Sequence, residues 1–337
     1  MDLLILGGTV FLGRHLASAA LARGHRVTLF NRGKHNPDLF PEAEKLRGDR
    51  TLPGGLDALA GRKFDAVIDT CGYVPRIVRE SARFLAGGTN NYCFISSVSV
   101  FQDFKTPDQD ENAPLGTLED ETVEEITGET YGPLKVLCEK AVETAFPGRA
   151  LNIRPGLIVG PDDPTDRFAY WPHRIAQGGE ALAPSSPMAL IQIIDVRDLA
   201  EWTIRLLEAK KTDVYNATGP DYPLTFGELL KVSADVSGSD AELVWVDKPF
   251  LEAEKVQPWS ELPLWIPESR DMPGFSRISV AKAIRDGLTF RPIAETVRDT
   301  LAWDRRRPQG EAWKNTLTRE REEELLAKWK SHTSDRG

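Results

Sequence analysis

The stretch "LLILGGTVFLGRHLASAALARGHRVTLFNRG" (residues 3–33) joins an apolar run, a glycine-rich turn and a helical pattern. The run stops at Gly7 and Gly8, and Gly13 precedes a segment rich in alanine and leucine. The first glycine permits a tight turn out of a strand, and the last lets a helix pack close to the sheet. Val10 carries a Cβ where the backbone of such a loop approaches a pyrophosphate, which predicts a displaced or weakened contact. We predict a strand, a loop that binds an anion and a helix whose first N–H groups face it; the alternative is a packing turn without a ligand.

Short apolar runs alternate with helical patterns through the first half of the chain. We expect strands at residues 3–6, 26–30, 66–69, 92–96 and 150–153, and helices at about 13–23, 76–85 and 133–145. Continuous apolar strands joined by helices form a parallel sheet that is covered on both faces. The predicted fold class is therefore α/β, with a doubly wound, Rossmann-like parallel sheet. Ligands of such sheets bind beyond the carboxyl ends of the strands.

The second half of the chain is richer in proline and loops, which suggests a separate lobe. We expect a dinucleotide-binding domain at residues 1–160, to which 190–219 return, and a smaller C-terminal substrate-binding lobe. This lobe would comprise residues 161–189 and 220–305. Residues 306–337 are dominated by charge and predict a solvated terminal helix with a tail.

Bulk composition excludes several classes of protein. The chain has 337 residues, of which 41% are apolar and 28% charged, a balance typical of globular proteins. A net charge of −9 argues against a surface for nucleic acid, which favours an excess of Lys and Arg. Cys71, Cys93 and Cys138 lie far apart without a CxxC pair, which indicates a reduced, cytoplasmic protein without structural zinc. We found neither a signal peptide nor a run of about 20 apolar residues, so we expect no membrane contact. We also expect no metal site.

The end of the second predicted strand, "LFNRGK", bears on the choice of cofactor. An acidic residue at this distance from the glycine loop would bind the ribose of NAD, but the position holds Asn31, followed by Arg32 and Lys34. A guanidinium can form a forked pair with a 2′-phosphate, which a carboxylate would repel. The sequence thus favours NADP, with NAD as the alternative. Asp49, in the stretch "LRGDR" (46–50), is either an acceptor for the adenine amine or a turn residue.

Two further stretches carry chemistry: "YCFISSVSVFQ" (92–102) and "TYGPLKVLCEK" (130–140). Tyr131 and Lys135 are four residues apart, which places both side chains on one face of a helix. The ammonium and a cationic nicotinamide ring would both stabilise phenolate, and lowering its pKa by about 3 units corresponds to about 4 kcal/mol. A serine hydroxyl from the first stretch would orient the substrate oxygen for proton transfer.

Five motifs in order resemble a known family. "GGTVFLG", Ser96-Ser97, Tyr131-x-x-x-Lys135, "RPG" (154–156) and "IDVRDLA" (194–200) are similar to those of the extended short-chain dehydrogenase/reductases, the NAD-dependent epimerase/dehydratase family. The resemblance covers about residues 1–305, and the altered glycine loop marks an atypical branch. It implies that Tyr131 is the acid/base, Lys135 the ribose-binding cation and Ser97 the hydroxyl partner, with Ser96 as the fallback.

The same resemblance implies the cofactor contacts. These would be Gly7, Thr9, Val10, Phe11, Leu12 and Gly13 in the loop, Cys71 and Gly72 beside the ribose, and Pro155 and Leu157 at the nicotinamide.

Differences from the motifs of the family argue against particular reactions and substrates. The sugar dehydratases of the family carry an acid pair after the catalytic Ser or Thr, whereas Val98 and Ser99 follow Ser97 here, which argues against dehydration. Leu190 and Ile191 stand where nucleotide-sugar enzymes usually carry an arginine, which argues against a nucleotide sugar. The glycine loop also resembles the branch that contains chloroplast stem-loop RNA-binding proteins, but these tend to lose the tyrosine that this chain retains.

We therefore expect an oxidoreductase that transfers a hydride between NADP and a carbonyl or alcohol carbon. The alternatives are a sugar epimerase with retained cofactor and, in a different class, an RNA-binding protein on the same fold. The substrate would be a small molecule, either a sugar or an aromatic carbonyl or alcohol, and a homodimer is a candidate assembly. Candidate substrate contacts are Ser99, Tyr73, Trp171, His173 and Trp265, although the two tryptophans could simply fill the core of the lobe. The acidic residues 108–129 suggest a solvated insertion near the rim of the cleft.

Overall fold

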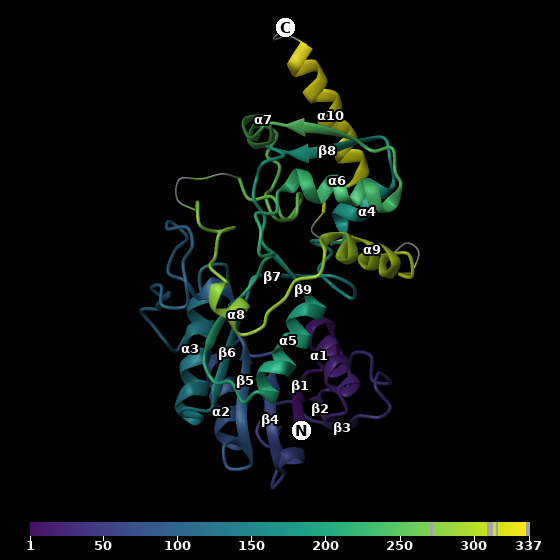
Figure 1. The fold of residues 1–337 in the computed structure, drawn as a ribbon. Helices are drawn as coiled ribbons and strands as arrows, with labels where there is room; N and C mark the ends of the chain where they lie inside the picture. Colours follow the sequence, from purple (N-terminus) through teal and green to yellow (C-terminus); the bar gives the residue numbers. More distant parts are fainter. Residues whose placement is uncertain (268, 270–271, 309–312, 315, 335–337) are drawn as a thin grey trace. The chain divides into compact units, whose positions relative to one another are not determined.

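The computed structural model, which describes residues 1–267, 269, 272–308, 313–314 and 316–334, contains a seven-stranded parallel sheet (Figure 1). The strand order is β10 (Val214–Ala217), β6 (Ala150–Pro155), β5 (Thr89–Ile95), β4 (Phe64–Asp69), β1 (Asp2–Leu6), β2 (Arg26–Asn31) and β3 (Glu44–Arg47). Every neighbouring pair in this order is parallel. The predicted doubly wound α/β fold is confirmed.

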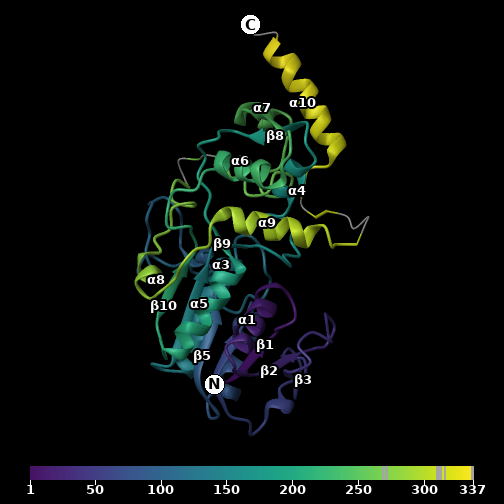
Figure 2. The same ribbon diagram turned by 45° about the vertical axis from the view of Figure 1, so that its right-hand side comes forward.

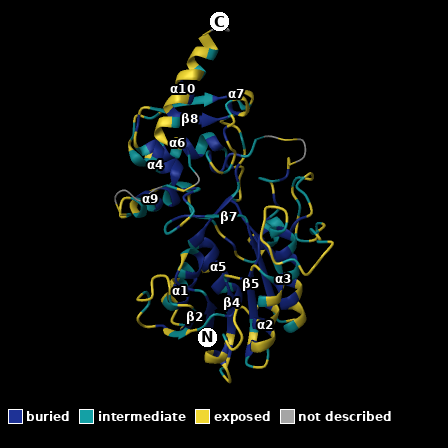
Figure 3. Cartoon of the chain, turned by 180° about the vertical axis from the view of Figure 1, so that it is seen from behind, coloured by how far each residue is buried: buried dark blue, intermediate teal, exposed yellow. Residues whose placement is uncertain are grey.

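Apolar runs form the central strands because both faces of the sheet are covered. The four residues 3–6 of β1 are fully buried. The interior of β4 and β5 is buried as well (Figure 3). The edge strand β3 has the charged sequence EKLR and is only partly buried. This strand therefore lacks the apolar pattern that predicts the others.

Two pairs of helices cover the sheet. α1 (Phe11–Ala22) packs against α5 (Val196–Glu208) on one face, and α2 (Pro75–Leu85) packs against α3 (Tyr131–Ala145) on the other (Figures 1 and 2). Pro133 lies in the first turn of α3, where its missing N–H leaves no hydrogen bond unmade. Tyr131 is the first residue of this helix.

The chain divides into two units. Unit 1 comprises residues 1–158, 196–219 and 271–290 and contains the seven-stranded sheet; unit 2 comprises 159–195, 220–270 and 291–337. The chain leaves unit 1 within β7 (Leu157–Val159) and returns to it after β9 (Ile193–Asp195). The sequence assigned all of 220–305 to the substrate lobe, but α8 (Ala281–Arg285) packs against β10 in unit 1.

Unit 2 is a small α/β unit. Its helices α4 (Tyr170–Ala176), α6 (Phe226–Ser237) and α9 (Ile293–Asp304) pack on one another, and β8 (Glu180–Pro184) pairs in parallel with β11 (Glu242–Val246). The helices α7 (Lys248–Ala253) and α10 (Arg319–Ser334) also belong to it.

The terminal helix α10 differs from the solvated helix that its charge predicted. Its residues Glu322, Leu325 and Leu326 are buried. The Glu322 carboxylate accepts hydrogen bonds from Arg174 Nε at 2.6 Å and from the backbone N–H of Leu182 at 2.9 Å. One face of α10 therefore belongs to the core of unit 2. No helix in the described part of the chain combines the length and apolar character needed to cross a bilayer.

Candidate active site

The glycine-rich loop joins β1 to α1 at the carboxyl edge of the sheet. Gly7 and Gly8 have φ angles of +112° and +88°, which side chains with a Cβ rarely adopt. A Cβ on Gly13 would lie 2.7 Å from the backbone nitrogen of Gly8, so only glycine lets the helix start this close to the loop. Phe11 also has a positive φ of 35°, which is uncommon for a bulky residue.

Val10, for which the sequence predicts a displaced or weakened pyrophosphate contact, lies at the start of α1. It is the N-cap residue of α1, with extended backbone and an exposed side chain. Because valine has no oxygen with which to cap the helix, it leaves the first N–H groups of α1 to other acceptors. The start of α1 therefore suits an anion.

Two asparagines hold the glycine-rich loop in place. Asn31 Nδ2 donates to the carbonyl oxygen of Gly7 at 2.8 Å, and Asn36 Nδ2 donates to that of Thr9 at 2.9 Å. Asn31 Oδ1 accepts from Arg47 Nη1 at 2.6 Å. The side chain of Asn31 thus ties the loop to β3, whereas the sequence suggested only a place beside the cofactor ribose. Asn36 and Arg47 were missed, because neither stands in a recognisable motif.

Positive charge gathers at the ends of β2 and β3. Arg32, Lys34 and Arg47 are all exposed there. The nearby Asp49 accepts hydrogen bonds from Thr51, from its backbone N–H at 3.0 Å and from its hydroxyl at 2.7 Å. These bonds, with a smaller contribution from Arg32 and Lys34, hold the pKa of Asp49 below its usual range. Asp49 is thus engaged as a turn residue, which is one of the two roles that the sequence left open.

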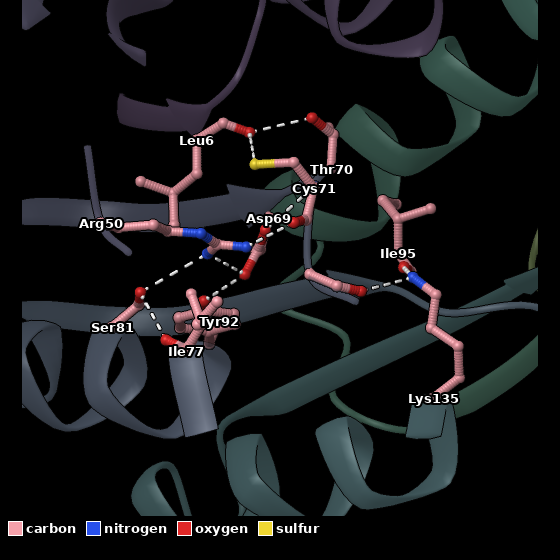
Figure 4. Close-up of polar contacts among 11 residues, drawn as sticks. Leu6, Arg50, Asp69, Thr70, Cys71, Ile77, Ser81, Tyr92, Ile95 and Lys135 are labelled. Atoms are coloured by element: carbon pink, nitrogen blue, oxygen red, sulfur yellow. Dashed lines mark hydrogen bonds and ion pairs between the residues drawn. The ribbon is translucent and has the colours of Figure 1, made fainter. Parts of the chain in front are cut away.

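A buried ion pair, missed in the sequence, fixes the turn after β4 (Figure 4). Arg50 Nη1 donates to Asp69 Oδ2 at 2.7 Å, and both side chains are nearly inaccessible to solvent. Tyr92 Oη donates to the same carboxylate oxygen at 2.8 Å. Burial opposes ionisation of Asp69, but Arg50 and the hydrogen bonds hold its pKa below the ordinary value. Arg50 Nη2 also donates to the carbonyl oxygen of Cys71 at 2.7 Å, so the pair braces the turn that leads to Gly72.

Lys135 connects the ends of two strands. Its Nζ donates to the carbonyl oxygens of Gly72 at 2.7 Å and Ile95 at 2.9 Å (Figure 4). The nitrogen lies 4.7 Å from the ring centre of Tyr73 and 6.0 Å from that of Tyr131. Burial lowers the pKa of Lys135 to about 8. The predicted lysine is therefore held at the carboxyl edge of the sheet, beside two phenol rings.

The serine turn and the start of α3 are packed together. Ser97 precedes a short 3-10 helix (Val98–Val100), and its Oγ donates to Ser99 Oγ at 3.0 Å and accepts from the Ser99 N–H at 3.1 Å. A Cβ on Gly132 would collide with the carbonyl oxygen of Ser99, so glycine permits this contact. Ser99 and Tyr131 line the same pocket. Ser96 Oγ, the fallback, is buried without a partner among the described residues.

Two of the predicted substrate contacts lie in the core of unit 2. Trp171 and Trp265 are almost fully buried, and their indole N–H groups donate to the carbonyl oxygen of Pro263 at 2.7 Å and to Ser185 Oγ at 2.8 Å. These contacts place both tryptophans in the core of unit 2, which is the alternative to substrate binding that the sequence left open.

His173, the third predicted contact in unit 2, is also engaged internally. Its Nδ1 lies 2.6 Å from Asp304 Oδ2, and its Nε2 lies 2.9 Å from Gln177 Nε2. Both ring nitrogens therefore have partners within the unit, which argues against a role in binding substrate.

Other predicted features also have defined places. Pro155 is buried at the end of β6, and Leu157 is half-buried at the start of β7. The acidic segment 108–129 is fastened to unit 1: Asp108 pairs with Arg277 and Glu124 with Arg76, both at 2.8 Å, and Glu111 Oε1 accepts from the Asn216 N–H at 2.8 Å. Among the described residues, no group of His, Cys, Asp and Glu side chains is arranged to hold a metal ion.

The buried Lys135 makes stability depend on pH. Its pKa is about 8 in the fold against an ordinary 10.5, so between these values the unfolded chain binds more protons. The free energy of unfolding contributed by this group therefore rises as the pH increases through this window, by about 3 kcal/mol in total. Relative to Lys135→Met, the wild-type protein should gain stability between pH 8 and 10.5 in urea denaturation. Lys140→Met, which removes an exposed lysine of the same helix, is the control; parallel curves for Lys135→Met and the wild type would contradict the prediction.

Comparison with known proteins places the chain in a family. The model of the NAD dependent epimerase/dehydratase family matches residues 3–218. The chloroplast stem-loop binding protein of 41 kDa b from Arabidopsis thaliana is 27% identical over 259 residues, which are 70% of this chain and 63% of that protein. The chain thus spans less than two thirds of the length of this relative.

Solved structures share the fold. The UDP-glucuronic acid 4-epimerase from Bacillus cereus in complex with NAD has a TM-score of 0.65 and 14% identity, over 90% of this chain and 99% of that one. The human epimerase family protein SDR39U1 with NADPH has a TM-score of 0.60 and 19% identity, with the same coverage. Because the family model covers well over half of the residues, this protein belongs to the NAD dependent epimerase/dehydratase family.

Proposed function

We propose that the protein is an oxidoreductase that uses a nicotinamide dinucleotide to transfer a hydride at a carbonyl or alcohol carbon of a small molecule. One observation carries this proposal. The buried Lys135, Tyr131 and the Ser97 turn lie at the carboxyl edge of the sheet that also carries the glycine-rich loop. This edge is where parallel α/β sheets bind their ligands.

Each of the three side chains has a task that its surroundings allow. Tyr131, at the start of α3, would give a proton to the substrate oxygen or take one from it. Lys135 would stabilise the phenolate form of Tyr131. Its ammonium group has three N–H donors, of which two bind the carbonyl oxygens of Gly72 and Ile95. Ser97 would hold the substrate oxygen through the hydroxyl that now bonds to Ser99.

The same edge suits the cofactor, which would supply or accept the hydride. The pyrophosphate would lie on the glycine-rich loop and the uncapped start of α1, which Gly13 allows to lie close against Gly8. Cys71 and Gly72 would lie beside the ribose, and Pro155 and Leu157 beside the nicotinamide.

We further propose that the cofactor is NADP, with Arg32 and Lys34 as partners of its 2′-phosphate. Replacing both by Ala should weaken NADPH binding by about 10- to 100-fold, the value of one or two charge-assisted hydrogen bonds, and leave NADH binding unchanged. Fluorescence titration of both cofactors measures this. Lys63→Ala is the matched control, because Lys63 is exposed before the opposite, amino end of β4. Equal affinities of the wild-type protein for NADPH and NADH would refute the NADP preference.

Two other functions are separable by simple measurements. A sugar epimerase uses the same three side chains but retains its cofactor, so stoichiometric dinucleotide in the purified protein would favour it over a reductase. The similarity to a stem-loop binding protein favours RNA binding as a second candidate. The net charge of −9 and the presence of both Tyr131 and Lys135 argue for the enzyme. Retention of a stem-loop RNA at moderate salt would reverse that preference.

A further inference from the structure

A pocket of about 710 Å³ opens beside Tyr131 within unit 1. We infer that it binds the substrate, and that this substrate is an uncharged aromatic or alicyclic carbonyl compound or alcohol, not a nucleotide-linked sugar. The inference rests on the proposed function, because it assigns the pocket to the molecule on which Tyr131 acts. The volume is in the usual range for sites that enclose a small organic molecule.

Aromatic rings form one wall of the pocket. Phe104 lies between Phe101 and Phe275, with ring centres 6.5 Å and 5.0 Å apart and interplanar angles of 85° and 66°. Phe101 is buried, whereas Phe104 and Phe275 are half-buried. Partly accessible edge-to-face rings offer a further aromatic ring both apolar area and favourable geometry.

The backbone holds this wall in place. The N–H of Gly274 donates to the carbonyl oxygen of Phe104 at 2.8 Å, and a Cβ on Gly274 would lie 2.5 Å from the carbonyl oxygen of Thr106. The N–H of Gly116 donates to the carbonyl oxygen of Val100 at 2.8 Å. Segments far apart in the sequence are therefore packed together around the rings, so the apolar wall is a built part of unit 1.

Charge on the lining excludes a diphosphate. Among the described residues that line the pocket, Glu129 carries the negative charge and no Lys or Arg is present. A phosphate needs cationic partners or several N–H donors, and a carboxylate in the same pocket would repel it. The hydroxyl groups of Ser99, Thr117 and Thr127 supply neutral hydrogen-bond partners instead. Hydroxyl groups beside aromatic rings can bind an uncharged molecule through both hydrogen bonds and apolar contact.

Two ligands with the same ring test this assignment: 1-naphthol and 1-naphthyl phosphate. In equilibrium dialysis with the full chain, 1-naphthol should bind at least about tenfold more tightly, because only the phosphate ester meets Glu129 with a charge. Phe104→Ala should weaken naphthol binding about tenfold, whereas Phe84→Ala, which removes an exposed ring of α2, should not. Equal binding of the two ligands, or equal effects of the two Phe variants, would overturn the inference.

If Phe104→Ala fails to fold, a second variant, Glu129→Gln, tests the assignment of the pocket. Glu129 is exposed, so Glu129→Gln keeps the shape of the side chain without affecting the core. It should raise the affinity for 1-naphthyl phosphate severalfold and leave that for 1-naphthol unchanged. Unchanged affinity for the phosphate ester, or binding of UDP-glucose as tight as that of 1-naphthol, would refute the charge argument.

The two proposals fail in different ways. Naphthol binding as expected, with NADPH consumption that does not depend on Tyr131, would refute the proposed function and leave the pocket assigned. Tyr131-dependent turnover of a substrate that does not compete with 1-naphthol would refute the pocket and leave the function standing.

Discussion

Tyr131→Phe is expected to lower the turnover number by 10²- to 10⁴-fold, roughly the contribution of a positioned acid or base. The change removes one hydroxyl and keeps the ring, so the start of α3 and its contact with the Ser97 turn should persist. NADPH affinity should stay within about twofold of the wild type, because the hydroxyl would act on the substrate oxygen only in the reaction. The measurement is NADPH consumption with an aromatic ketone such as 2-acetylnaphthalene, combined with a fluorescence titration of the cofactor.

Tyr73 is the natural competitor for this role, and Tyr73→Phe is the matched control. Its ring centre lies closer to Lys135 Nζ than that of Tyr131, at 4.7 Å against 6.0 Å, and the two rings are 6.5 Å apart. Desolvation, and then the neighbouring Tyr131, raise the pKa of Tyr73 to about 12, so its phenol ionises less readily than that of an ordinary tyrosine. Tyr131 lines the pocket and Tyr73 does not. We therefore expect Tyr73→Phe to retain most of the activity; a larger loss in Tyr73→Phe than in Tyr131→Phe would reverse the assignment.

The features that the sequence predicted correctly depend on local pattern. Continuous apolar runs indicated the buried strands, and the spacing of Tyr131 and Lys135 placed both on one helix next to Pro133. Both inferences follow from the period of the backbone, which acts over a few residues. The edge strand β3 lacks that pattern because only part of it is buried.

Contacts between distant residues could not be read in the same way. Asn31 was recognised as a non-acidic residue at the end of β2, but its bond to the Gly7 carbonyl depends on the pairing of β1 with β2. Trp171 has the same local pattern whether it stacks on a ligand or fills a core, and its burial in unit 2 decided between them. In the charged sequence of α10, Glu322 resembles the solvent-exposed residues around it. Its burial depends on its partner Arg174, which is 148 residues away.

Arg50→Met is expected to reduce the free energy of unfolding by about 3–5 kcal/mol, because it leaves the Asp69 carboxylate buried without its cation. Asp69 is fully inaccessible to solvent, and Arg50 is 8% exposed. The hydrogen bonds from Tyr92 and from the Cys71 N–H would remain, but they cannot replace a full positive charge. Urea denaturation at neutral pH measures the loss. Arg26→Met, which breaks an exposed pair with Asp2, is the control and should change little.

The double variant Arg50→Met/Asp69→Asn separates the uncompensated charge from the lost contacts. Since it removes both charges, it should recover much of the stability that Arg50→Met loses. It should not recover the position of the turn, because Arg50 Nη2 also holds the Cys71 carbonyl next to Gly72, whose own carbonyl accepts from Lys135. NADPH affinity should therefore be lower than in the wild type both in Arg50→Met and in the double variant, although the double variant regains stability. A double variant that restores both would show that the ion pair does not position Lys135 through this turn. A double variant that is no more stable than Arg50→Met would show that the uncompensated charge of Asp69 is not the cause of the loss in stability.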